Sequence, residues 1–147
     1  ANTQTYLMTT IDEKLIRLEE EISQNKDVSI INLVEYLLEK ADKSRVSDIH
    51  IDPTIDSVKV RFRIDGLLQE SYYLPKKIHN EVISRIKVLS RLRTDEHQSA
   101  QDGRFRYTFL ETGRFIDVRV SVVPTYHGEN VVMRLLSDKS EDLDLID

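Results

Sequence analysis

Six arginines occupy alternate positions of strand-like segments, and they are the residues of this 147-residue chain best suited to binding chemistry. The planar guanidinium of arginine offers paired N–H donors that match phosphate or carboxylate oxygens. Where the alternation is clean, each arginine lies out of phase with the apolar residues of its segment, which places it on the face opposite the core. The six are Arg61, Arg63, Arg104, Arg106, Arg119 and Arg134.

This arginine-bearing face has two interpretations that the alternation alone leaves open. It is either a phosphate-binding face or a solvated sheet face on which arginines pair with acidic residues of neighbouring strands. Asp65, Glu70 and Asp117 are the acidic residues available for such pairs. The segment 130–136 is apolar on both faces, which predicts that Arg134 is partly covered.

Other chemistries find little support in the sequence. The four glycines form neither GxxxxGK[ST] nor GxGxxG, so the chain carries no phosphate-cradling loop of its own. Cysteine is absent and the four histidines lack metal-ligand spacing, so no metal site is predicted. His50 alternates with Ile49 and Ile51, which indicates an ordinary half-buried histidine. We assign no catalytic residue to this chain.

Nucleic acid is not an expected partner. The net charge is −5, although eleven of the twelve arginines lie within residues 45–136. A sheet that binds single strands stacks bases on aromatic residues displayed beside its basic ones. Here the strand aromatics are predicted to point away from the arginines and into the core: Phe62, Phe105, Tyr107 and Phe109.

Three helices are predicted from apolar residues at helical spacing. The first covers residues 11–22, with Thr10 and Glu13 as a capping box. The second runs from a cap at Ser29 to about residue 43. The third opens at Pro75 and buries a stripe of isoleucine, valine and leucine, which leaves a basic outer surface that includes Lys87.

Six strands are predicted, at residues 47–52, 57–65, 67–74, 104–109, 115–122 and 130–136. Asp65-Gly66 indicates a tight hairpin because a primed turn needs positive φ. Residues 94–103 are expected to form a polar loop. Together, the predicted helices and strands indicate an α+β domain whose antiparallel sheet is covered by helices on one face. We expect neither a signal peptide nor a membrane span, since no apolar run approaches the roughly 20 residues that a span needs.

Five ordered motifs resemble those of a known family. They are SDIHIDP (47–53), VRFRIDGLL (60–68), SRIKVLSRL (84–92), QDGRF (101–105) and IDVRVSVVPTYHGENVVMRLL (116–136). This series is similar to the small N-terminal (N2) domain that precedes the motor domain in type II secretion and type IV pilus assembly ATPases, of the GspE/PilB type. Five motifs in the same order are far more specific than any single one.

The resemblance implies a PAS-like α+β fold and a place in a hexameric ATPase that powers pilus assembly or protein secretion. The small domain there packs on motor domains of the same or a neighbouring subunit and closes over ATP, whose phosphates its arginines contact. Arg104 of QDGR and Arg119 of DVRVS match the phosphate-contacting arginines, and Arg134 of VVMRLL matches a recurrent position of less defined role. ATP and Mg²⁺ would be held by the motor domain, which carries the Walker motifs, so this chain by itself is not expected to be an enzyme.

The same resemblance divides the chain into three parts and implies a cellular location. Residues 1–28 are expected to be an N-terminal segment with a linker helix, 29–137 the PAS-like domain, and 138–147 the start of the linker to a motor domain outside this chain. The location implied is the cytoplasm, peripheral to the inner membrane, with indirect contact to the membrane platform and no membrane insertion. The family often has an arginine and a proline just before QDGR, where this chain has residues 97–100 and a more mobile loop is expected. The alternatives are a stand-alone PAS-like ligand sensor and a protein-interaction module.

Overall fold

The computed structural model describes residue 20 and residues 29–137. In chain order the elements are α2 (Ile30–Lys43), β1 (Asp48–Pro53), β2 (Ser57–Ile64), β3 (Leu67–Pro75), the 3-10 turn η1 (Lys76–Ile78), α3 (His79–Leu89), β4 (Gln101–Thr108), β5 (Phe115–Thr125) and β6 (Gly128–Ser137). The helix predicted at residues 11–22 lies outside the described residues except for Glu20, and so does the acidic segment 138–147.

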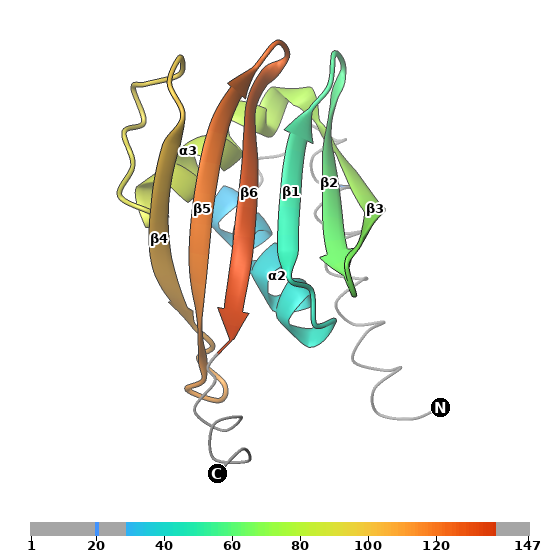
Figure 1. The fold of residues 1–147 in the computed structure, drawn as a ribbon, viewed down its shortest axis with the longest axis vertical. Helices are drawn as coiled ribbons and strands as arrows, with labels where there is room; N and C mark the ends of the chain where they lie inside the picture. Colours follow the sequence, from blue (N-terminus) through green and yellow to red (C-terminus); the bar gives the residue numbers. More distant parts are fainter. Residues whose placement is uncertain (1–19, 21–28, 138–147) are drawn as a thin grey trace.

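The described strands form one six-stranded sheet in the order β3-β2-β1-β6-β5-β4. Every neighbouring pair is antiparallel, and the first and last of the described strands, β1 and β6, lie side by side at the centre. Figure 1 looks onto this sheet with both helices behind it. Consequently β4, with its two arginines, is an edge strand that pairs with β5 alone among the described strands.

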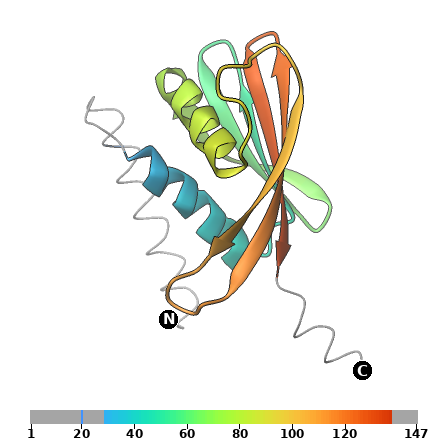
Figure 2. The ribbon, with the colours of Figure 1, turned by 90° about the vertical axis from the view of Figure 1, so that its left-hand side faces the viewer.

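Both α2 and α3 pack on the same face of the sheet, as the view in Figure 2 shows. Helix α2 buries Leu33, Val34, Leu37, Leu38 and Ala41, which recur at helical spacing. The strands contribute the alternate residues that are out of phase with the arginines, among them Ile49, Val60, Val118 and Met133. The predicted α+β class, with helices on one face of an antiparallel sheet, is confirmed.

Local signals set several element boundaries as predicted. Ser29 caps α2, because its hydroxyl accepts a hydrogen bond from the backbone N–H of Asn32 at 3.2 Å. Asp65 and Gly66 adopt φ values of 52° and 81°, which is the left-handed geometry of a primed hairpin turn. The hairpin therefore sets the register between β2 and β3, with Ile64 opposite Leu67.

Two predictions about this region were wrong. Strand β4 begins at Gln101, inside the predicted 94–103 loop, because residues 101–103 continue the backbone pairing with Val122, Ser121 and Val120 of β5. Backbone hydrogen bonds need no apolar side chain, so the sequence pattern missed this extension. Lys87, predicted on the basic outer surface of the third helix, is completely buried, because it follows Ile83 by one helical turn on the core side of α3.

Candidate functional site

Five charged residues form a single row across five strands on the face opposite the helices. The strand register pairs Arg104 with Arg119, Arg119 with Arg134, Arg134 with Asp48, and Asp48 with Arg63. Directly opposed residues have Cβ atoms about 4.5–5.5 Å apart, and like charges in such positions repel. Three arginines therefore stand next to one another, and the one carboxylate of the row lies between Arg134 and Arg63.

That carboxylate, Asp48, is buried and fully engaged. Arg134 donates from Nε to Oδ1 at 3.0 Å, and the Ser47 hydroxyl donates to Oδ2 at 2.9 Å. Arg63 Nε lies 3.7 Å from Oδ2 on the other side. Burial acts to raise the pKa of Asp48, but the hydrogen bonds from Arg134 and Ser47 outweigh it and leave the pKa below its ordinary value. Asp48 is thus ionised and holds the guanidinium of Arg134 in a fixed position.

Arg104 and Arg119 differ from the other four arginines. Both are exposed, and neither forms an ion pair with another residue of the described part of the chain. Their side chains and Arg134 border a shallow depression of about 570 Å³. The depression is lined by Asp48, Asp102, Gly103, Arg104, Arg119, Val120, Ser121, Val132 and Arg134. Two adjacent guanidinium groups that form no ion pair with the described residues can clamp the oxygens of a phosphate group.

The remaining arginines are ion-paired. Arg61 contacts Asp52, and Arg106 donates to Asp117 at 2.9 Å while its guanidinium carbon lies 3.8 Å from the ring centre of Phe115. Of the predicted acidic partners, Asp117 is confirmed. Arg61 and Arg63 instead pair with Asp52 and Asp48, because β1 lies beside β2 in the sheet. The ion-pair interpretation therefore holds for four arginines, and the phosphate-binding interpretation stays open for the other two.

The prediction that Arg134 is partly covered was wrong. Its side chain is 64% exposed, because both helices of the described residues pack on the other face of the sheet. The prediction for the aromatic residues is confirmed. Phe62 is 2% exposed, and Phe105, Tyr107 and Phe109 pack partly buried against the core, away from the arginines.

A buried polar network was not predicted from the sequence, and it joins α3 to the start of β6. Lys87 of α3, with no exposed surface, pairs with Glu129 of β6, whose exposed fraction is 8%. The sequence spacing of both residues indicates their burial. Lys87 follows Ile83 by four positions, which is one helical turn, and Glu129 precedes Val131 by two positions, which puts both on the same face of a strand. Two opposite charges, each in phase with apolar residues of its own element, indicate a buried pair.

The comparisons with known proteins place this chain in a family. The family model described as Type II/IV secretion system protein matches residues 23–147. The chain therefore belongs to this family, and the resemblance drawn from the five motifs is confirmed. The matching relatives include proteins of both type II secretion and type IV pilus assembly.

Three relatives show the extent of the similarity. The type IV pilus assembly ATPase PilB of Myxococcus xanthus is 39% identical over 133 residues, covering 90% of this chain and 23% of its own length. The type II secretion system ATPase E of Vibrio cholerae is 39% identical over 136 residues, covering 92% and 27%. The type II secretion system protein E of Xanthomonas campestris is 46% identical over 110 residues, covering 75% and 19%. The chain thus spans about a quarter of the length of these relatives.

A solved structure supports the fold. The X-ray structure of the Legionella pneumophila ATPase DotB superposes with a TM-score of 0.50 at 16% sequence identity, covering 70% of this chain and 28% of that one. At this identity the similarity concerns the fold alone. Within the part of the chain that the structure describes, no helix has the length and apolar character needed to cross a membrane.

Proposed function

We propose that residues 29–137 form the arginine-supplying, regulatory domain of a secretion or pilus assembly ATPase. In this proposal Arg104 and Arg119 contact the phosphates of ATP that is bound on a motor domain outside this chain. The motor domain, of the same or a neighbouring subunit of a hexamer, holds the nucleotide and Mg²⁺. The domain closes over the nucleotide and carries no catalytic residue of its own. Residues 1–28 are then the preceding segment with a linker helix, and 138–147 lead towards the motor domain.

The observation that carries the proposal is the pair of exposed, adjacent arginines without acidic partners among the described residues. Directly opposed like charges destabilise a sheet unless an anion lies between them. A phosphate group provides that anion, and its oxygens accept paired N–H donors from each guanidinium. In the closed state the two arginines would stabilise the charge that develops during phosphoryl transfer.

Arg134 takes a different part in the proposed mechanism. Because Arg134 Nε donates to Asp48 at 3.0 Å and Asp48 balances its charge, Arg134 is less available to a phosphate group than Arg104 and Arg119. It contributes mainly by its position next to Arg119, where it adds to the positive potential of the row. Its loss should therefore weaken turnover less than the loss of either Arg104 or Arg119.

The test is ATP turnover by the full-length protein that contains this chain. Arg104→Ala and Arg119→Ala should each lower kcat by about 10³-fold, the scale at which an arginine acts on a transferring phosphoryl group. Because both side chains are exposed, the same changes should alter the free energy of unfolding by less than about 0.5 kcal/mol.

Arg106→Ala is the matched control. Arg106 lies on the same strand and the same face as Arg104 but is engaged by Asp117 and Phe115, so turnover should stay within about twofold of the unaltered protein. Normal turnover of both the Arg104 and the Arg119 variant would show that the row is a structural feature only.

A further inference from the structure

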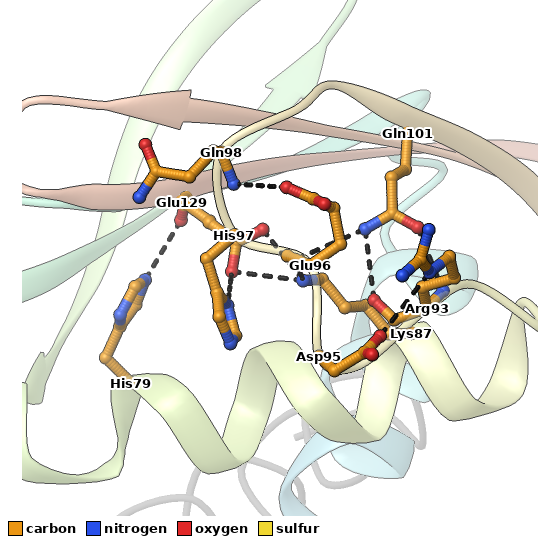
Figure 3. A network of polar contacts seen from close by, with 9 residues as sticks. All are labelled: His79, Lys87, Arg93, Asp95, Glu96, His97, Gln98, Gln101 and Glu129. Carbon is orange, nitrogen blue, oxygen red and sulfur yellow. Dashed lines mark hydrogen bonds and ion pairs between the residues drawn. The ribbon is translucent and has the colours of Figure 1, made fainter.

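The buried network around Lys87 joins three separate parts of the fold (Figure 3). The Lys87 ammonium lies 2.8 Å from Glu129 Oε2 and donates to Glu129 Oε1 at 3.1 Å. It also donates to the backbone carbonyl of Glu96 at 2.6 Å. His97 Nδ1 lies 2.8 Å from Glu129 Oε1. Helix α3, strand β6 and the loop of residues 93–100 are thereby held at one point.

This loop has no apolar anchor of its own. Seven of its eight residues are exposed, and Glu96 is half-buried. Its remaining contacts are polar and come from Gln101, whose side chain accepts from the backbone N–H of Arg93 at 2.9 Å and donates to its carbonyl at 3.1 Å. The position of the loop therefore depends on polar contacts from Lys87, Glu129 and Gln101, because hydrophobic packing does not hold it.

The loop runs directly into the strand that presents Arg104. Gln101 is the first residue of β4, and Arg104 follows three positions later. Since β4 pairs only with β5 in the described sheet, one side of it has no neighbouring strand to hold it in place. The loop is one further constraint on β4, at the end of the strand three residues before Arg104, in addition to the contact of Gly103 with Ser90.

We infer that Lys87 and Glu129 are positioning residues, whose ion pair clamps the 93–100 loop and so fixes where β4 presents Arg104. The consequence for turnover rests on the proposed function, whereas the clamp itself does not. Two observations support an ion pair at this point. Lys87 is entirely inside the protein with its ammonium satisfied, and hydrogen bonds from His97 and Lys87 overcome the effect of burial and lower the pKa of Glu129.

The experiment uses the double variant Lys87→Met/Glu129→Gln, which removes both charges together while keeping similar side-chain length. When both members of a buried ion pair are replaced together, no unpaired charge remains and the fold is retained. Replacing only one of them would leave the other charge buried without a partner. The control is Arg114→Gln/Asp42→Asn, which removes an ion pair between α2 and the residue before β5. Both are made in the full-length protein, with and without Arg104→Ala.

Hydrogen exchange measures the clamp directly. In the clamp variant, backbone amides of the 93–100 loop should exchange about tenfold faster, while those of β1 and β6 stay within about twofold. The control should leave the loop unchanged. An unchanged loop in the clamp variant would overturn the inference, and so would a uniform acceleration across the whole sheet, which indicates a role in stability alone.

Steady-state kinetics tests whether Lys87 and Glu129 affect ATP turnover through Arg104. The clamp variant should lower kcat about fivefold or more and change KM for ATP less than twofold, and it should have no further effect in the Arg104→Ala background. Losses that multiply in that background would show that Lys87 and Glu129 do not act through Arg104. If Arg104→Ala and Arg119→Ala both leave turnover normal, the proposed function fails, and the exchange result still decides whether the clamp exists.

Discussion

Gly103, the glycine of the QDGR motif, should not tolerate even a methyl group. Its φ lies outside the left-handed region, so conformational freedom does not explain the glycine. A Cβ at this position would lie 2.8 Å from the backbone oxygen of Ser90 and 2.9 Å from Leu92 Cδ2. Helix α3 ends against β4 here, and the substitution Gly103→Ala tests that close approach.

The loss of stability on Gly103→Ala depends on which of the neighbouring atoms can move away from the added methyl group. Leu92 can rotate its side chain, but the Ser90 oxygen is backbone at the end of α3. Ordinary contact begins at 3.4 Å, so helix and strand must separate by about 0.6 Å at a contact of 2.8 Å. Overpacking of this kind costs about 1–3 kcal/mol. At roughly 4 °C per kcal/mol for a domain of this size, a cost of 2 kcal/mol lowers Tm by about 8 °C.

Urea titration measures this cost, and Gly66 is the matched control. Gly66 has a φ of +81°, and a Cβ added there would meet nothing within 4 Å, so its substitution is strained by the backbone and not by contact. Asparagine tolerates the left-handed region better than alanine does. Gly66→Asn should therefore cost less than Gly66→Ala, and Gly103→Asn should cost more than Gly103→Ala, because its side chain is larger.

Equal stability of Gly103→Ala and the unaltered protein, with an unchanged m-value, would refute the close approach of α3 and β4. If Gly103→Asn costs less than Gly103→Ala, as expected at Gly66, backbone conformation and not close contact would be the cause of the destabilisation at Gly103. Either result would also weaken the argument that contacts from α3 and its following loop position Arg104.

Three further predictions concern stability. Asp48→Asn keeps the shape but removes the charge that Arg134 contacts, so it should cost about 1–3 kcal/mol in a urea titration, whereas the same change at the half-exposed Asp117 should cost less than about 1 kcal/mol. Burial lowers the pKa of His79 below its ordinary 6.5. The contribution of neutral His79 to the free energy of unfolding is therefore fully present above pH 6.5 and is lost as the pH falls through the lowered pKa. The urea midpoint should decline from pH 7 to 5, and it should decline less steeply in His79→Gln. Ser29→Ala removes the cap of α2 and should cost about 1 kcal/mol in the same titration, with Ser29→Asp close to the unaltered protein.

The elements of the fold could be predicted because alternation and helical spacing report directly on burial. Val58, Val60 and Phe62 alternate with charged residues, and the structure buries all three. The prediction failed where side chains do not decide the structure. Gln101 and Asp102 carry no strand signal, yet they extend β4 because β5 offers its backbone groups to them.

The candidate site could be predicted only as a set of arginines on one face. Which of them pair with a carboxylate depends on the strand register, and register is a property of the assembled sheet. Asp48 lies 86 positions before Arg134 in the chain but directly opposite it in space. The resemblance singled out Arg104 and Arg119, and the structure independently leaves these two without acidic partners among the described residues. Their contact with phosphate stays a prediction.

The row of arginines also dictates how related sequences can change in length. Arg104, Arg119 and Arg134 sit on three successive strands joined by two turns, and they meet because their strands are in register. Residues can be inserted in the turn after β4 or the turn after β5 without moving the row. One residue inserted within β5, between its start and Arg119, would rotate Arg119 to the core face, because side chains alternate. Relatives should therefore vary in turn length and keep strand length, and these arginines are better recognised by strand pairing than by a fixed spacing.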